Sequence, residues 1–202
     1  MRTVGEFSWL LSFDDEDEPG ANGRARRVAA LLHSLQPEGL VEAVPAARSV
    51  FVEGSPSFDA EILVGLEAGR LEAPAPEAAS HEIRVTLGGE DLPEVCGALG
   101  LSPEAFGEAL LEASYTVGFL GFSPGFPYLY GLPARLRRPR RRTPRLSVPA
   151  GSLAMAGPYV GIYPASMPGG WNLLGTVDAV LFDPERRPPA LLAPGDTVRF
   201  RR

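Results

Sequence analysis

Seven arginines fall within the segment RLRRPRRRTPR, which runs from Arg135 to Arg145. A guanidinium group stays charged at physiological pH and can bind a carboxylate or a phosphate through two parallel hydrogen bonds. Pro139 and Pro144 stiffen this segment, which favours a partly pre-organised anion clamp. We therefore single out Arg140 and Arg145, the arginines that follow the two prolines, as candidate anion contacts. A solvated loop of exposed charges is the alternative interpretation.

Two short segments near the arginines combine glycine with aromatic residues: GFSPGFPYL (121–129) and PGGW (168–171). Glycine lets a ligand or a second chain approach the backbone, and an aromatic ring supplies a flat apolar wall. We predict that Phe126 and Trp171 are pocket walls, and that Ser152 is a donor to a substrate carbonyl. The glycines that would allow a close approach are Gly125, Gly151, Gly169 and Gly170. Structural turns with the rings in the core are the alternative.

No complete catalytic constellation is visible in the sequence. The two histidines, His33 and His81, lie far apart, and no cluster of histidine, cysteine and acidic residues has the spacing of metal ligands. There is no GxGxxG or P-loop motif, and all 19 basic residues are arginine, which excludes Schiff-base chemistry on lysine. We interpret Cys96 as a small buried residue. We therefore predict no metal site and assign no catalytic residue.

The bulk composition narrows the possible partners and locations. The net charge of −6 argues against binding to nucleic acid or to a membrane surface, both of which favour a basic face. A single cysteine cannot form an intramolecular disulfide. The apolar run near the N-terminus is short and is soon interrupted by acids, so it predicts neither a signal peptide nor a membrane span. We expect a cytoplasmic protein.

The first 78 residues alternate between strand and helix patterns, which predicts a small α/β domain. Strands are expected over 6–13 and 40–52. One helix is expected from Asn22, as its cap, to Leu35, and another from Ser57, as its cap, to Leu71. The acidic run at 14–18 is interpreted as a solvated turn, and the Pro-Ala-Pro sequence at 74–76 as a stiff link.

The remaining part, residues 79–202, is predicted to be a β-barrel domain that also carries two short helices. Residues 81–87 alternate as a half-buried strand, and helices are expected over 91–99 and 103–114, the second with Ser102 as its cap. From Tyr115 onward no helical period is present, and short strand candidates separated by turns indicate a barrel or sandwich. These candidates are Val148, 153–155, 160–163, 172–174, 177–182 and 197–200. The predicted fold class is α+β.

Four motifs occur in one order along the chain: GFSPGFPYLYGL, PRLSVPAGSLAMAG, GIYPASMPGGWNLLGT and LLAPGDTVRF. Together they resemble the KipI-type family, and the resemblance covers nearly the whole chain. That family includes the B subunit of 5-oxoprolinase, kinase-inhibitor-like proteins, and the C–D subdomain of the urea carboxylase carboxyltransferase, once labelled allophanate hydrolase subunit 1. Two departures are visible: no histidine shortly precedes Tyr115, and Ala47 replaces the tyrosine of the family's PAYRS segment.

The resemblance implies an N-terminal α/β domain, a C-terminal cyclophilin-like barrel, and a subunit that is not active alone. It would work with a homologous cyclophilin-like subunit and a third subunit in a 5-oxoprolinase, which converts 5-oxo-L-proline to L-glutamate with ATP. The complex would use the ATP, whether or not this subunit contacts it. Two alternatives stay open: an inhibitor that binds a sensor histidine kinase, and a component of a biotin-dependent carboxyltransferase or allophanate hydrolase. The fold alone does not choose among them.

Overall fold

The computed structural model describes residues 1–14, 17–68 and 78–202. The chain divides into two compact units, Met1–Glu77 and Ala78–Arg202, and each is described by itself below. The predicted link at 74–76 lies outside the described residues. None of the helices in the described ranges is long and apolar enough to cross a membrane.

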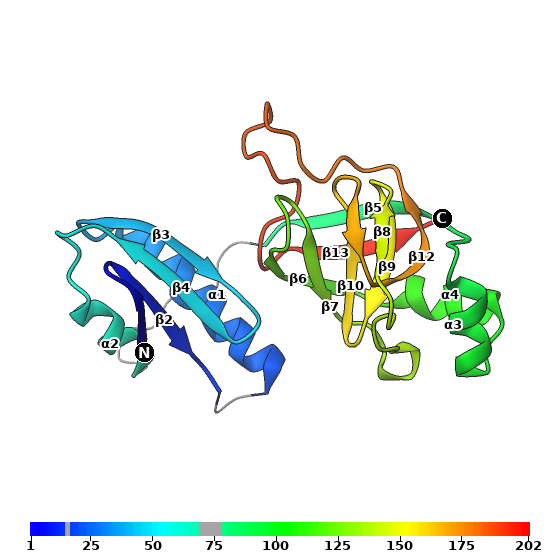
Figure 1. Ribbon diagram of the computed structural model, residues 1–202, viewed down its shortest axis with the longest axis horizontal. Coiled ribbons are helices and arrows are strands. Elements are labelled where there is room, and N and C mark those ends of the chain that lie inside the picture. Colours follow the sequence, from blue (N-terminus) through cyan, green and yellow to red (C-terminus); the bar gives the residue numbers. More distant parts are fainter. Residues whose placement is uncertain (15–16, 69–77) are drawn as a thin grey trace. The chain divides into compact units, whose positions relative to one another are not determined.

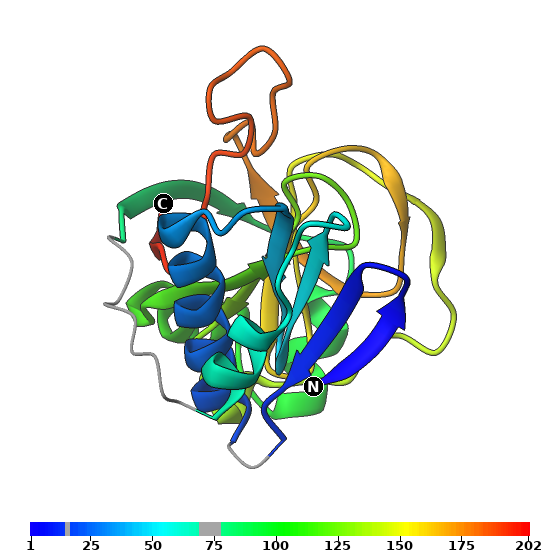
Figure 2. The ribbon, with the colours of Figure 1, turned by 90° about the vertical axis from the view of Figure 1, so that its left-hand side faces the viewer.

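The first unit is a four-stranded antiparallel sheet with two helices. The strand order is β1-β2-β4-β3, and α1 lies along one face of the sheet (Figure 2). The elements are β1 (Arg2–Gly5), β2 (Ser8–Ser12), α1 (Glu18–Leu35), β3 (Leu40–Pro45), β4 (Ser49–Gly54) and α2 (Glu61–Glu67). Alternate residues of β4, Val50 and Val52, are buried together with Ala25 and Leu32 of α1. The core therefore follows from period 2 in the strand and period 3.6 in the helix.

Helix α1 begins earlier than predicted. Its cap is Asp17, whose side chain accepts a hydrogen bond from the backbone N–H of Gly20 at 3.0 Å. The predicted cap, Asn22, lies buried inside the helix and donates from Nδ2 to the carbonyl of Ala46 at 2.9 Å. Part of the acidic run expected to be a solvated turn thus supplies the helix cap, where a carboxylate also stabilises the N-terminal end of the helix dipole.

Two further expectations for this unit need correction. The alternation of strands and helices suggested an α/β arrangement, but every strand pair in the sheet is antiparallel. Helix α2 starts at Glu61, and Ser57 does not cap it. Its predicted end, Leu71, lies outside the described residues.

The second unit is a closed seven-stranded barrel with the order β10-β7-β6-β13-β5-β12-β9 (Figure 1). All neighbouring strands are antiparallel except β13 and β5, which are parallel. Its strands are β5 (Ser80–Leu87), β6 (Tyr115–Leu120), β7 (Pro127–Tyr130), β9 (Ser152–Ala156), β10 (Tyr159–Ile162), β12 (Asn172–Val177) and β13 (Thr197–Arg201). The prediction of an α+β fold with a barrel is confirmed.

Two helices, α3 (Leu92–Leu99) and α4 (Pro103–Glu112), pack against β12 and β13 respectively. As predicted, Ser102 caps α4, and its Oγ accepts from the N–H of Ala105 at 3.2 Å. Cys96 of α3 is buried as predicted, and burial raises the pKa of its thiol. Tyr115 lies in the same core and donates to the carbonyl of Leu110 at 2.9 Å, and burial raises the pKa of its hydroxyl.

Several strands lie outside the strand candidates predicted from the sequence. These are β6, β7 and β11 (Met167–Gly169), the last of which pairs with β8 (Arg145–Val148) in a separate two-stranded sheet. Proline masks the pattern: Pro127 is the first residue of β7, a position that needs no ladder donor. The strand expected over 177–182 is wrong, because β12 ends at Val177. A short 3-10 turn, η1 (Ala134–Leu136), precedes the arginine loop.

A matched pair of glycine substitutions tests this packing. A Cβ on Gly175 of β12 would overlap the backbone of Thr86 in β5, whereas one on Gly97 of α3 would meet nothing within 4 Å. We expect Gly175→Ala to lower the free energy of unfolding by about 1–3 kcal/mol, because the backbone cannot yield as a flexible side chain would. Gly97→Ala should raise it by about 0.5–1 kcal/mol through helix propensity. Urea denaturation measures both, and equal effects would contradict the strand packing.

Candidate functional site

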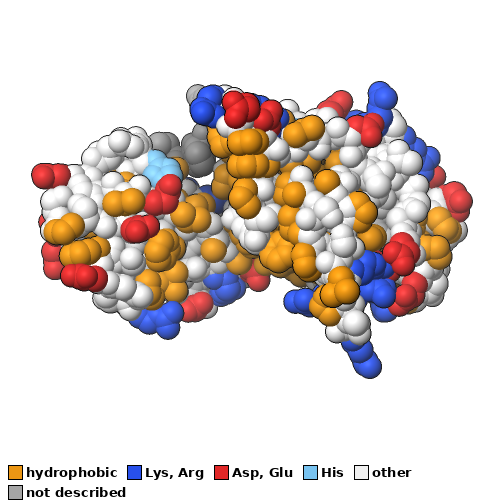
Figure 3. Space-filling view, turned by 45° about the horizontal axis from the view of Figure 1, so that its top comes forward, with side chains coloured by type: hydrophobic (Ala, Val, Ile, Leu, Met, Phe, Trp, Pro, Cys, Tyr) orange, Lys and Arg blue, Asp and Glu red, His pale blue; other side chains and the backbone are white. Residues whose placement is uncertain are grey.

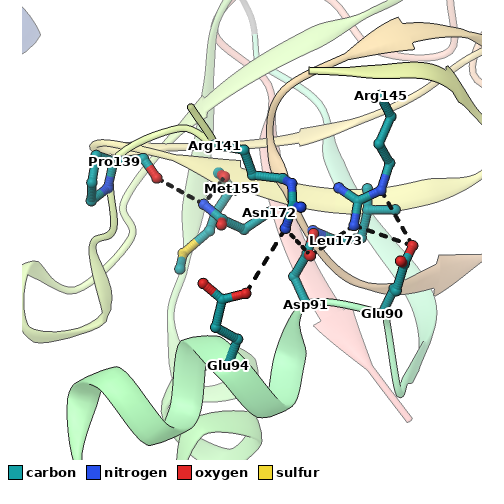
Figure 4. Close-up of polar contacts among 9 residues, drawn as sticks. All are labelled: Glu90, Asp91, Glu94, Pro139, Arg141, Arg145, Met155, Asn172 and Leu173. Atoms are coloured by element: carbon teal, nitrogen blue, oxygen red, sulfur yellow. Dashed lines mark hydrogen bonds and ion pairs between the residues drawn. The ribbon is translucent and has the colours of Figure 1, made fainter. Parts of the chain in front are cut away.

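The carboxylate of Asp91 holds the arginine segment against the barrel (Figure 4). Asp91 directly precedes α3 and is 4% exposed. Its Oδ1 accepts hydrogen bonds from Arg141 Nη1 at 2.6 Å and from Arg145 Nη2 at 2.7 Å. Its Oδ2 accepts from the backbone N–H of Leu173 in β12 at 2.7 Å. One buried side chain therefore joins the helix, the barrel and the arginine segment.

These contacts fix the charge of the Asp91 carboxyl. Burial by itself raises the pKa of Asp91, but the hydrogen bonds from Arg145 and Leu173 and the charges of Arg145 and Arg141 outweigh it. The pKa of Asp91 therefore lies below its ordinary value, and the Asp91 hydrogen bond in turn raises the pKa of Arg145. Both groups are charged at neutral pH, so the pair is a permanent electrostatic anchor.

Hydrogen bonds to its backbone hold the rest of the arginine loop, which we define as residues 137–145. The N–H of Arg141 donates to the carbonyl of Gly170 at 2.7 Å, and the carbonyl of Arg138 accepts from the N–H of Gly157 at 2.7 Å. Asn172 Nδ2 donates to the carbonyl of Pro139 at 2.9 Å. The loop is thus tied at three points between its ends. Its side chains are therefore presented from a hydrogen-bonded backbone.

The loop borders a hollow of about 440 Å³. The residues that line this arginine hollow are Glu94, Arg138, Pro139, Arg140, Arg141, Arg142, Thr143 and Asn172. Basic and acidic side chains stand next to each other at one edge of the second unit (Figure 3). Within the described ranges, no hydrogen bond or ion pair is formed by the guanidinium groups of Arg138, Arg140 or Arg142. The hollow therefore presents uncommitted positive charge in a chain whose net charge is −6.

An aromatic wall adjoins the arginine loop. The rings of Phe126 and Trp171 lie edge to face with centroids 5.4 Å apart, and Tyr163 meets Phe126 at 5.2 Å. Arg140 lies beside this wall, because a Cβ on Gly170 would be 3.1 Å from its Nη2. Burial raises the pKa of the Tyr163 hydroxyl and outweighs the opposing effects of the Trp171 backbone hydrogen bond and of the Arg145 and Arg140 charges. Barrel closure thus brings the two glycine-aromatic segments together with one of the predicted arginines.

The two arginines singled out from the sequence have different surroundings. Arg140 is exposed and borders both the hollow and the wall. Arg145 is 15% exposed and already binds Asp91, and its Nε donates to Glu90 at 3.2 Å. Its charge is committed within the chain, so in this structure Arg145 positions the loop. A substrate contact by either arginine stays a prediction.

The predicted glycines serve close packing within the chain. Gly125 and Gly151 have φ values of 75° and 78°, in the left-handed region that favours glycine. A Cβ on Gly125 would lie 2.7 Å from Phe182 Cβ, and one on Gly151 would lie 2.9 Å from the Val177 carbonyl. A Cβ on Gly169 would overlap the Tyr163 ring, so this glycine lets the aromatic wall form.

Ser152 is 4% exposed in β9, and its carbonyl accepts from the N–H of Tyr163 at 3.0 Å. Ser152 and these glycines thus take part in packing within the chain. Their binding roles stay predictions.

Sequence reasoning missed Asp91 and a second buried acid, Asp196. Asp196 is 5% exposed, and its carboxylate accepts from the N–H groups of Ala79 at 2.9 Å and Ala193 at 2.8 Å. His81 Nε2 lies 2.9 Å from Asp196 Oδ2. This pair ties the start of β5 to the turn before β13. In the sequence, Asp91 stands at the start of a predicted helix and Asp196 stands in a predicted turn. Neither position indicates that the carboxylate is buried.

The sequence model described as carboxyltransferase domain, subdomain C and D, matches residues 1–192. The chain belongs to the carboxyltransferase subdomain C and D family. Within this family, it is 39% identical to the B subunit of 5-oxoprolinase from Escherichia coli O157:H7, over 98% of this chain and 93% of that protein. It is 35% identical to the B subunit of 5-oxoprolinase from Bacillus subtilis, over 99% of this chain and 91% of that protein.

Among solved structures, the protein TTHA0988 resembles this chain with a TM-score of 0.85 and 44% identity. The similarity covers 96% of this chain but 39% of the TTHA0988 chain. This member of the carboxyltransferase subdomain C and D family thus spans about two fifths of the length of that relative.

The Asp91 anchor is tested by Asp91→Asn. We expect a loss of about 3 kcal/mol in the free energy of unfolding at pH 7, because two arginines lose their buried partner. The folded pKa of Asp91 is lowered, so its stabilisation is fully present above the unfolded value of about 3.9 and is lost as pH falls through the folded value. The difference from wild type should therefore shrink below about pH 4 in urea denaturation.

The matched control is Glu94→Gln. Glu94 is 77% exposed and lies 4.0 Å from Arg141 Nη1, so removing its charge should cost less than about 0.5 kcal/mol. If the two variants were equally stable at pH 7, Asp91 would not be the anchor.

Proposed function

We propose that this chain is the B subunit of an ATP-dependent 5-oxoprolinase that converts 5-oxo-L-proline to L-glutamate. The observation that carries the proposal is the similarity to two proteins named as the B subunit of 5-oxoprolinase, which extends over nearly the full length of this chain and of each relative. The family by itself leaves the reaction open, since one fold hosts several chemistries.

The site supports a binding role better than a role in proton transfer. Around the arginine hollow, the described residues provide guanidinium groups and aromatic rings. 5-Oxoproline is a lactam that bears a carboxylate, and ATP brings phosphoryl groups, so both substrates present anions that arginine recognises well. In this proposal the chain holds and orients an anionic group, and a partner subunit supplies the groups that react.

Two features support the requirement for a partner. TTHA0988 carries the matching segment within a longer chain, so in that relative this region is continuous with further polypeptide.

Two large apolar side chains, Phe122 and Val180, are 64% and 63% exposed. Their segments adjoin, because Gly125 packs on Phe182. Exposed apolar side chains of this kind suit burial against another protein. We propose that a homologous barrel subunit covers them and that a third subunit completes the enzyme.

A second candidate is a component of a biotin-dependent carboxyltransferase, and the description of the matching family favours it. A carboxyl group carried by biotin is also a small anion that the arginine hollow could hold. The two candidates differ in their second substrate. Transfer of labelled carboxyl from a biotin carrier, without turnover of 5-oxoproline, would select the carboxyltransferase.

Reconstitution tests the 5-oxoprolinase. The chain alone should not hydrolyse 5-oxoproline, whereas the chain co-expressed with the homologous barrel subunit and the third subunit should release glutamate only when ATP is present. Arg140→Gln should reduce kcat/KM about tenfold or more, because a charge-assisted hydrogen bond to the substrate is lost. Arg135→Gln removes an exposed arginine outside the hollow and should have little effect. Absence of glutamate formation with all subunits present would reject the proposal.

A further inference from the structure

The charges around the arginine hollow do not balance. Five guanidinium groups meet here: Arg138, Arg140, Arg141, Arg142 and Arg145. Three carboxylates oppose them: Glu90, Asp91 and Glu94. Two positive charges therefore remain uncompensated at one place in a chain of net charge −6. Such a local excess of positive charge attracts anions.

The backbone that carries the uncommitted charges is held in place. Asp91 fixes the side chains of Arg141 and Arg145, and Gly157 and Gly170 fix the backbone of the arginine loop. Arg141 Nε and Arg145 Nη1 are buried polar atoms without a hydrogen-bond partner among the described residues. Both atoms belong to arginines that are already bound to Asp91, so they mark the anchored side of the arginine loop and not the anion contacts.

We propose that the arginine hollow binds a phosphoryl dianion through Arg140 and Arg142, with Arg138 at its edge. A dianion neutralises the two uncompensated positive charges, whereas a carboxylate, which carries one negative charge, leaves one of them uncompensated. Guanidinium forks suit the several oxygens of a phosphoryl group. A long polyanion fits less well, because Glu94, which is 77% exposed, lines the same hollow and would repel it. The binding itself does not depend on the proposed function, which enters only as the origin of the phosphoryl group.

Titration calorimetry of the full chain at low ionic strength tests the charge match. The probes are methyl phosphate and sulfate as dianions, and acetate as a monoanion of carboxylate chemistry. We expect saturable binding of one equivalent of each dianion, and acetate to bind about tenfold more weakly or worse, since it forms fewer charge-assisted hydrogen bonds. Equal binding of acetate, or no saturable binding of any probe, would overturn the proposal.

Variants locate the site. Arg140→Gln and Arg142→Gln should each weaken sulfate binding about tenfold. Arg135→Gln removes the same charge from the exposed turn η1, outside the hollow, and should change sulfate binding by less than about twofold. Thermal denaturation shows whether each variant is folded. A similar loss in all three variants would mean a diffuse charge effect and would refute a defined site.

The pH dependence distinguishes a dianion from a monoanion. A phosphate monoester takes its second charge at about pH 6, whereas sulfate keeps two charges throughout. The titratable groups that face the hollow and its wall are Glu90, Asp91, Glu94, Tyr128 and Tyr163. A change in the protonation of these groups would alter the affinity for both probes. The affinity for methyl phosphate relative to sulfate should rise between about pH 5 and pH 7. A constant ratio would contradict recognition of the dianion.

The assembled complex separates this proposal from the proposed function and identifies the source of the phosphoryl group. If the dianions bind to the chain but the complex does not hydrolyse 5-oxoproline, only the enzyme assignment is rejected. If the complex is active and the Arg140→Gln, Arg142→Gln double variant has unchanged activity and unchanged sulfate affinity, the phosphoryl site is rejected. Competition of sulfate with a non-hydrolysable ATP analogue would assign the phosphoryl group to the nucleotide. If the ATP analogue did not compete with sulfate and methyl phosphate still bound, the phosphoryl group would be assigned to a phosphorylated substrate.

Discussion

The ion pairs of Asp91 are the constraint on which the rest of the site depends. A carboxylate that is 4% exposed must be paired if it is to stay ionised, and here two arginines and a backbone N–H provide the partners. Since Arg141 and Arg145 lie within the same loop, this contact determines where the loop runs. It also divides the arginines by role. Arg141 and Arg145, which bind Asp91, position the loop. Arg138, Arg140 and Arg142 remain available to an anion from outside the chain.

The closed barrel supplies the second part of the site. Its strand order places β7 next to β10, so that Phe126 and Trp171 meet over Gly161, where an added Cβ would lie 2.9 Å from both rings. The apolar wall and the charged hollow share Arg140 and Gly170 as neighbours. A ligand that combines an anionic group with a flat or apolar part would contact both surfaces. A carboxylated lactam and a nucleotide both have this character, which fits the enzyme proposed above.

The sequence was most informative where local chemistry is distinctive. Ser102 before Pro103 predicted a helix start that the structure confirms. Proline and arginine in one short segment predicted an anion-binding loop, and its binding role stays a prediction. The sequence was least informative about partners that are distant in the chain. The partner of Arg145 lies 54 residues away, and an aspartate before a helix resembles an ordinary cap. For the same reason the cap of α1 was placed at Asn22, since asparagine is a good cap and its burial depends on tertiary contacts that the local sequence does not show. The strands β7 and β11 were missed because proline and glycine conceal their alternation.

Arginine side-chain NMR during a sulfate titration measures the division of roles most directly, because each Nε–H group reports separately. We predict that the Nε–H signals of Arg140 and Arg142 shift in a saturable way, that the signal of Arg145 stays in place, and that Asp91→Asn abolishes this distinction. Equal shifts at Arg145 and Arg140 in the wild-type chain would show that Asp91 does not hold Arg145 out of the anion site, and would contradict the division of roles.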